Sequence, residues 1–216
     1  MVIIPLEKKL KKKLHRQIAL AQDILIDQVY RFFPKAILHG GTAIWRCFGS
    51  NRFSEDLDFY LSSFSKSKID QFIKSLESLG FSKLKFKRTK NAIFSKFEYG
   101  EVIIRFEALI KEIKDYTTMS FEMIDGNFII VNTLSTKTLL EEKINSYLSR
   151  KKIRDLYDIF FLLEFIEKNS QTRNTLNDFL KKYSLPKDEK DIKTLIISGA
   201  IPKTEDMLQR IKKWAR

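Results

Sequence analysis

The sequence contains a single cysteine, Cys47, among its 216 residues. An intramolecular disulfide is therefore impossible, and a cysteine-rich metal site is excluded. No apolar run approaches the roughly 20 residues that a membrane-spanning helix needs, and the basic N-terminal segment lacks the apolar core of a signal peptide. Internal repeats, low-complexity tracts and flexible Gly/Ser linkers are also missing. These absences predict a protein without membrane spans that works in the cytoplasm.

Acidic residues are the scarcer charge. The chain has 40 Lys and Arg residues against 27 Asp and Glu, which gives a formal net charge of +13. Such an excess favours a polyanionic partner such as a nucleic acid. The alternative is a lysine-rich composition that places Lys on every surface regardless of function. With 44% hydrophobic residues at this length, the chain suits one domain or a compact two-lobed unit.

Residues 36–61, AILHGGTAIWRCFGSNRFSEDLDFYL, form the stretch around which the chain is organised. The pattern predicts a strand at 36–39, a helix at 42–48 and a second strand that carries two acids. Asp56 and Asp58 are two residues apart, so both carboxylates leave the same face of that strand. Paired acids repel each other unless a cation lies between them, and carboxylates beside a bound phosphate suit Mg²⁺. The alternative is an ordinary acidic pair on the surface.

The glycine pair Gly40–Gly41 separates the first strand from the helix. Glycine lets the backbone approach a ligand closely, Thr42 is placed to cap the helix, and the amides at the helix start are predicted to face a triphosphate. Arg52 precedes the acidic strand and can meet phosphate oxygens with two donors. His39 is interpreted as a structural residue. Because no Gly-Lys-Ser/Thr follows the glycines, a P-loop ATPase or kinase is disfavoured.

The remaining pattern predicts a sheet-containing part followed by a helical part. Helices are expected at 6–33 and 65–79, strands at 83–87, 92–99, 101–109 and 128–131, a helix from Ser135, and a buried helix at 159–166. The boundary falls near residue 133, which gives domains at 1–132 and 133–216. Glu107 lies on the polar face of the strand at 101–109. It is interpreted either as a third carboxylate of the site or as a surface partner of Arg105 or a lysine.

A second polar group lies in the helical part. Lys143 can neutralise a triphosphate as a point charge. Asp155 and Asp158 are three residues apart and share a helix face. Asp155 is interpreted as a salt-bridge partner of Lys143 or of an arginine rather than as a metal ligand. A wholly structural cluster is the alternative.

These motifs resemble those of a known family. Gly-Gly-Thr at 40–42, followed by Arg52, Ser54, Asp56, Leu57, Asp58 and Phe59, is similar to motif one of the polymerase-beta-type nucleotidyltransferases, and in particular to the AbiEii/AbiGii toxins with their "GGT" and "R-x-S-x-D-L-D-F". The later residues also resemble that family's helical motifs, more loosely: Leu140, Glu142, Lys143, Ile144, Arg150, Arg154, Asp155, Leu156, Tyr157 and Asp158.

The resemblance implies an α+β fold, with a polymerase-beta-like sheet and flanking helices followed by a helical C-terminal lobe that closes the active-site cleft. It implies catalysis by Asp56, Asp58, Glu107 and Lys143, with the first three holding Mg²⁺, although Glu107 departs from the family's more usual Asp. The residues that it implies for binding the nucleoside triphosphate are Gly40, Gly41, Thr42, Arg52, Ser54, Lys143 and Asp155.

The predicted function is magnesium-dependent transfer of a nucleoside monophosphate to an acceptor hydroxyl. The family resemblance implies the 3′ end of tRNA as acceptor, a role as the toxin of a toxin–antitoxin system, and a cognate antitoxin as partner. Two alternatives stay open. One is an enzyme of the same fold that modifies a small molecule or a protein, and the other is a catalytically silent module that binds RNA or a partner protein.

Overall fold

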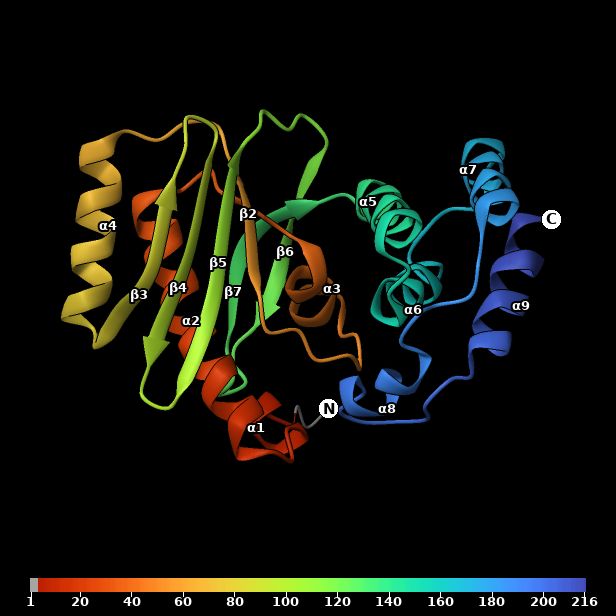
Figure 1. Cartoon of the computed structure of the whole chain (residues 1–216), viewed down its shortest axis with the longest axis horizontal. Coiled ribbons are helices and arrows are strands. Elements are labelled where there is room, and N and C mark those ends of the chain that lie inside the picture. Colours follow the sequence, from red (N-terminus) through yellow and green to blue (C-terminus); the bar gives the residue numbers. More distant parts are fainter. Residues whose placement is uncertain (1–3) are drawn as a thin grey trace. The chain divides into compact units, whose positions relative to one another are not determined.

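The computed structural model describes residues 4–216, which divide into two compact units (Figure 1). The first unit contains the chain up to Gly49 together with Ser54–Thr133. The second contains Ser50–Phe53 and Leu134–Arg216. The short segment Ser50–Phe53 therefore leaves the first unit, contributes to the second, and returns. Within residues 4–216, no helix is both long and apolar enough to cross a membrane.

The first unit is built on a seven-stranded mixed sheet with the order β3-β4-β5-β2-β1-β7-β6. Its strands are β1 (Ile37–His39), β2 (Leu57–Leu61), β3 (Phe81–Arg88), β4 (Ala92–Tyr99), β5 (Val102–Ile110), β6 (Tyr116–Glu122) and β7 (Phe128–Leu134). The central strand β2 runs antiparallel to β1 and parallel to β5, while β3, β4 and β5 form an antiparallel meander. A hairpin around Gly100 joins β4 to β5, as the sequence predicts.

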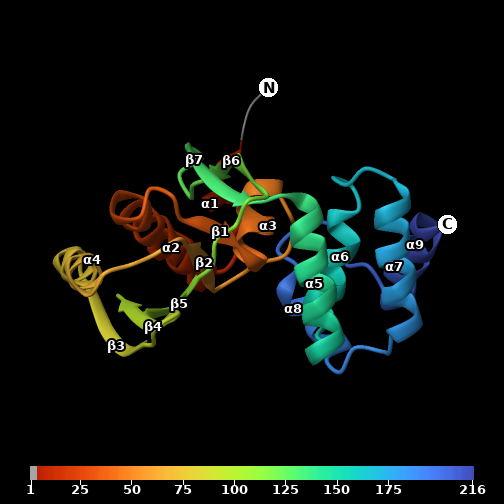
Figure 2. The same ribbon diagram turned by 90° about the horizontal axis from the view of Figure 1, so that it is seen from above.

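Helices cover one face of this sheet. The helices of the first unit are α1 (Leu6–Lys9), α2 (Lys13–Phe32), α3 (Gly40–Phe48) and α4 (Lys66–Ser78). Figure 2 shows α2 and α4 on the same side of β3, β4 and β5, where they pack against β5 and β3. Over these three strands, the opposite face carries no helix from the described residues of the first unit. This opposite face is called the open face below.

The predicted helix at 6–33 is wrong in one respect, because it is broken into α1 and α2. Leu10 has extended backbone angles and a side chain that is only 1% exposed, so it is buried between the two helices. The backbone N–H of Glu7 donates to the carbonyl oxygen of Ile124 at 2.9 Å. Tertiary contacts of α1 with the turn after β6 thus override the helical periodicity. The end of α2 before Pro34 agrees with the sequence prediction.

The second unit is helical. Its helices are α5 (Thr136–Arg150), α6 (Ile153–Leu162), α7 (Ser170–Lys182), α8 (Ile192–Leu195) and α9 (Thr204–Ala215), with a short 3₁₀ turn at Glu189–Asp191. Ser135 caps α5 by accepting from the N–H of Thr138, which confirms the predicted helix start. The predicted helix at 159–166 is wrong at its end. The helix stops at Leu162, and Phe165 is 43% exposed rather than buried.

Candidate active site

Two acids stand side by side on the sheet of the first unit. The strand register pairs Asp58 of β2 with His39 of β1 on one side and with Glu107 of β5 on the other. Glu107 in turn is paired with Phe94 of β4. Residues paired across strands project to the same face. Leu57 and Phe59, the neighbours of Asp58, are fully buried on the helix-covered side. The carboxylates of Asp58 and Glu107 therefore belong to the open face.

The pKa of Glu107 is raised above its ordinary value. Partial burial is the main cause, and the negative charge of Asp58 raises the pKa further, while His39 and Arg105 lower it. Two neighbouring carboxylates that repel each other in this way favour either a proton or a cation between them. His39 itself stacks on Tyr60 with ring centroids 3.9 Å apart, which agrees with its structural interpretation.

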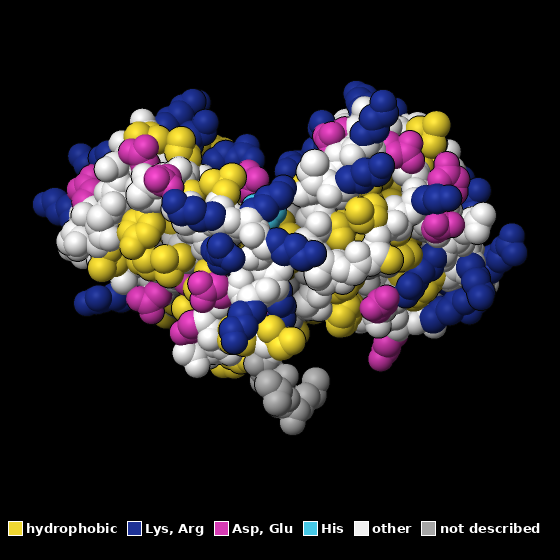
Figure 3. All heavy atoms as spheres, turned by 90° about the horizontal axis from the view of Figure 1, so that it is seen from below, with side chains coloured by type: hydrophobic (Ala, Val, Ile, Leu, Met, Phe, Trp, Pro, Cys, Tyr) yellow, Lys and Arg dark blue, Asp and Glu magenta, His cyan; other side chains and the backbone are white. Residues whose placement is uncertain are grey.

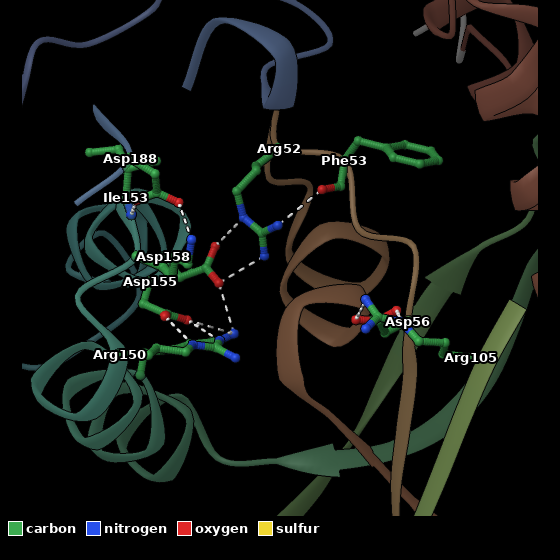
Figure 4. Close-up of polar contacts among 11 residues, drawn as sticks. Arg52, Phe53, Asp56, Arg105, Arg150, Ile153, Asp155, Asp158 and Asp188 are labelled. Atoms are coloured by element: carbon green, nitrogen blue, oxygen red, sulfur yellow. Dashed lines mark hydrogen bonds and ion pairs between the residues drawn. The ribbon is translucent and has the colours of Figure 1, made fainter. Parts of the chain in front are cut away.

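The third acid, Asp56, faces a cation of the protein. Arg105 donates two hydrogen bonds to its carboxylate, each 2.7 Å long (Figure 4). As a result, no group of three or more His, Cys, Asp or Glu side chains within residues 4–216 is arranged to hold a metal ion. The donor chemistry nevertheless fits Mg²⁺, because all three groups are carboxylates and a guanidinium takes the place of a cation beside Asp56. Metal binding by Asp56, Asp58 and Glu107 stays a prediction.

Gly40 begins α3 directly beside Asp58. Its φ is +74°, and a Cβ built on it would lie 2.5 Å from Oδ2 of Asp58. Both facts require glycine, the first because L-residues rarely adopt this conformation and the second because no Cβ fits there. The sequence prediction of a close backbone approach is thus realised, and the group that approaches Gly40 in this structure is the Asp58 carboxylate. Gly41, in the first turn of α3, is buried.

The predicted helix cap by Thr42 is wrong. The helix begins two residues earlier, with His39 at the N-cap and no side-chain cap. Thr42 is fully buried, and its hydroxyl donates to the backbone carbonyl of Asp56 at 2.5 Å. Thr42 therefore fastens α3 to the segment that carries the acids. Ser54 lies in the same segment, and its carbonyl accepts a 3.0 Å hydrogen bond from Gln22.

A pocket of about 190 Å³ contains all three acids on the open face. Its lining residues come from β2, β3, β4, β5 and the segment before β2, and they are Asp56, Asp58, Lys85, Phe94, Ser95, Lys96, Arg105, Phe106 and Glu107. Sequence reasoning missed the contributions of Lys85, Phe94 and Lys96. The alternation of β5 places Arg105 and Glu107 on one face, but strand pairing is needed to bring β3 and β4 beside them.

The second predicted group is a buried ion-pair cluster within the second unit. Arg52 donates to both carboxylate oxygens of Asp158, at 2.7 and 2.8 Å, and Lys143 lies 2.9 Å from the same carboxylate (Figure 4). Burial raises the pKa of Asp158, but the charges and hydrogen bonds of Arg52 and Lys143 outweigh it, so the pKa is lower than normal. A further donor of Arg52 binds the carbonyl of Phe53.

Asp155 forms the salt bridge that its position suggests. Arg150 donates two 2.7 Å hydrogen bonds to it, and Lys143 lies 3.9 Å away. Arg52 and Lys143 are only 3% and 6% exposed. For either to bind a phosphate, its ion pair with Asp158 has to open. Nucleotide binding by Arg52, Lys143 and Asp155 stays a prediction.

A mixed sheet with two acids at a central strand, a third on its parallel neighbour and a glycine-led helix beside them is typical of nucleotidyltransferases. The family model described as "Nucleotidyl transferase AbiEii toxin, Type IV TA system" matches residues 24–213. The chain therefore belongs to the AbiEii nucleotidyltransferase toxin family, which confirms both the predicted family and the predicted enzyme class. Membership implies a nucleotide substrate and an antitoxin partner, and nucleotidyltransferases generally use divalent metal ions.

Solved structures share the fold. JHP933 from Helicobacter pylori is 19% identical over 91% of this chain and 90% of its own, with a TM-score of 0.63. A putative nucleotidyltransferase from H. pylori is 20% identical over 91% and 92%, with a TM-score of 0.62. MenT4, a nucleotidyltransferase toxin from Mycobacterium tuberculosis, is 14% identical over 92% and 81%, with a TM-score of 0.60. The predicted α+β class is confirmed. No curated relative matches the chain.

Proposed function

We propose that the protein transfers a nucleoside monophosphate from a nucleoside triphosphate to the 3′ hydroxyl of tRNA in the cytoplasm, as the toxin of a toxin–antitoxin pair. The observation that carries this proposal is the row of Asp58 and Glu107 across β2 and β5, with Gly40 packed against Asp58. It puts two carboxylates and a glycine-led helix start within one small region of the first unit. Phosphoryl transfer needs such a region, because its catalysis is mostly positioning and charge compensation.

In the proposed reaction, the acceptor oxygen attacks the α-phosphorus and forms a new P–O bond. The bond between the α-phosphorus and its bridging oxygen breaks, and pyrophosphate leaves with the electron pair. Glu107 accepts the proton of the hydroxyl, for which its raised pKa suits it. Asp56, Asp58 and Glu107 would hold Mg²⁺, which supplies charge neutralisation at the phosphates and a lower pKa of the acceptor hydroxyl. Arg105 has to leave Asp56 before that carboxylate can bind a metal ion.

The start of α3 is the proposed phosphate contact of the first unit. The backbone amides of Gly40 and Gly41 lie at the positive end of the helix dipole, where anions are favoured. The buried hydroxyl of Thr42 supports them indirectly by holding α3 to the segment before β2. These residues therefore position the triphosphate, while the carboxylates act at the reacting atoms.

The choice of tRNA rests on charge. The net charge of +13 favours a polyanionic acceptor, and contacts to an RNA backbone need no sequence reading. Figure 3 shows Lys and Arg side chains spread over the surfaces of both units, with acidic side chains among them. A distributed positive charge of this kind attracts RNA, and the local features of the site have to position its end.

The test incubates the protein with total tRNA, Mg²⁺ and each of the four labelled nucleoside triphosphates. Label in the tRNA band is expected with the wild type and is expected to be lost with Asp58→Asn. The matched control is Asp70→Asn, which makes the same change at an exposed residue of α4 and should keep full activity. Label only in a protein or a small molecule would contradict the tRNA acceptor. Absence of label from every acceptor, with no nucleotide binding, would contradict the whole proposal.

A further inference from the structure

The open face of the sheet continues past the acids as a basic surface. Lys96 of β4 is paired with Arg105 of β5 on one side and with Lys85 of β3 on the other. A parallel row on the same face joins Glu107 to Phe94 and then to Lys87. Lys85, Lys87 and Lys96 are exposed and form no ion pair with any residue between 4 and 216. Lysines without acidic partners attract anions more strongly than paired ones.

Phe94 lies between these lysines with 40% of its surface exposed. A large exposed ring in the middle of a sheet is a cost to folding unless it contacts a ligand. Phe94, Lys85 and Lys96 all line the pocket that contains the three acids. The ring and the cations are therefore continuous with the candidate active site.

The two sides of Asp58 differ in what they can bind. Gly40 and the start of α3 lie on the β1 side, where the proposed function puts the triphosphate. The strands β5, β4 and β3 lie on the other side in the sheet order. In-line displacement requires the attacking and leaving oxygens to lie on opposite sides of the phosphorus. With pyrophosphate leaving toward α3, the acceptor approaches over β5 and β4.

We propose that the open face of β3, β4 and β5 binds the unpaired 3′ end of an RNA acceptor, with a base stacked on Phe94 and backbone phosphates on Lys85 and Lys96. This inference rests on the proposed function and adds the residues that receive the acceptor. A stacking ring flanked by cations suits single-stranded nucleic acid, because every unpaired base offers a π-face and each nucleotide a phosphate. Paired bases in a duplex offer no such face.

The first experiment measures binding alone. A fluorescein-labelled single-stranded RNA is titrated into the full chain without nucleotide, and anisotropy gives the Kd. Lys85→Glu/Lys96→Glu is expected to raise the Kd at least about tenfold and to flatten the salt dependence by roughly 0.7 per lost contact. The matched control, Lys66→Glu/Lys74→Glu, makes the same charge change at exposed positions of α4 and should differ little from wild type. Equal losses in both pairs would overturn the proposed site.

Phe94 is tested separately from charge. Phe94→Ala is expected to raise the Kd about tenfold, within the range for loss of one base stack, and Phe94→Tyr should restore binding because it keeps the ring. Phe128→Ala removes a comparably exposed ring, 48% accessible, from β7 and serves as the control. An unchanged Kd in Phe94→Ala would overturn the stacking contact. Displacement of the RNA by polyglutamate as readily as by unlabelled RNA would point to an acidic protein instead and overturn the proposal.

Nucleotide transfer distinguishes this inference from the function on which it rests. If the wild type labels tRNA, Lys85→Glu/Lys96→Glu should raise the KM for tRNA with little change in kcat. A wild-type KM in that variant would overturn the inference and leave the proposed function standing. If the wild type labels no RNA, the proposed function fails, and the binding experiments alone decide whether the open face holds a single strand.

Discussion

Gly40 provides the sharpest test of the site, because a single methyl group there meets a single carboxylate. In Gly40→Ala, the new Cβ would lie 2.5 Å from Oδ2 of Asp58 at a φ of +74°. Ordinary contacts of a Cβ begin near 3.4 Å. Either the Asp58 side chain or the start of α3 therefore has to move by about 1 Å, and a displacement of that size at a reacting group can cost about 10²-fold in rate.

The conformational cost of the substitution is separable from the clash. An alanine in the left-handed region costs about 1 kcal/mol in folding free energy wherever it is placed. Gly100, in the turn between β4 and β5, has a φ of +57°, and a Cβ added to it would have nothing within 4 Å. Gly100→Ala should therefore lose about the same stability from strain alone and keep full activity.

The assay measures nucleotide transfer under saturating substrate together with denaturant unfolding of both variants. The expected result is a rate loss of about 10²-fold for Gly40→Ala and none for Gly100→Ala, with both variants folded. Full activity of Gly40→Ala would refute the reasoning, since it would show that the position of the Asp58 carboxylate does not matter. A similar loss in Gly100→Ala would also refute it, because strain without a clash would then suffice.

Three further predictions follow from the ion pairs. Arg105→Ala should free Asp56 and tighten Mg²⁺ binding by about two- to fivefold in calorimetry, the worth of an exposed ion pair; weaker binding would contradict competition between the two cations. Asp158→Asn should lower the unfolding free energy by about 3–5 kcal/mol, because Arg52 stays buried without its carboxylate; exposed Asp178→Asn should change it by under about 0.5 kcal/mol. Since the pKa of Asp158 is below its ordinary 3.8, its stabilisation should persist at neutral pH and disappear as acid unfolding proceeds below 3.8; Asp158→Asn should remove that part of the acid dependence.

Local signals in the sequence predict most elements of the fold. The strand Ala92–Tyr99 has the predicted bounds, and the helix Lys66–Ser78 begins after the predicted cap, Ser65, whose side chain accepts from Lys68. The strand Tyr116–Glu122 escapes prediction because six of its seven residues are exposed or half-buried and only Phe121 is fully buried. Without alternation between a buried and an exposed face, the period of a strand is not visible.

The site is predictable up to the point at which strand order matters. Asp56 and Asp58 are recognisable from their spacing, and Glu107 from the polar face of its strand. Their neighbours are not, because Lys85 and Phe94 reach the acids only through the order β3-β4-β5-β2. The pairing of Arg105 with Asp56 is similarly invisible, since the two residues are 49 positions apart in the chain.

Two acid pairs, 56/58 and 155/158, look equally suited to a metal in the sequence, and their surroundings separate them. Asp155 and Asp158 are fully buried, and three cations of the second unit, Arg52, Lys143 and Arg150, already satisfy them. A further cation would gain little there. Arg105 reaches only Asp56, and the charge of Asp58 still raises the pKa of Glu107. Electrostatic need, which depends on tertiary structure, thus selects the acids of the first unit as the place where a cation from solution would bind.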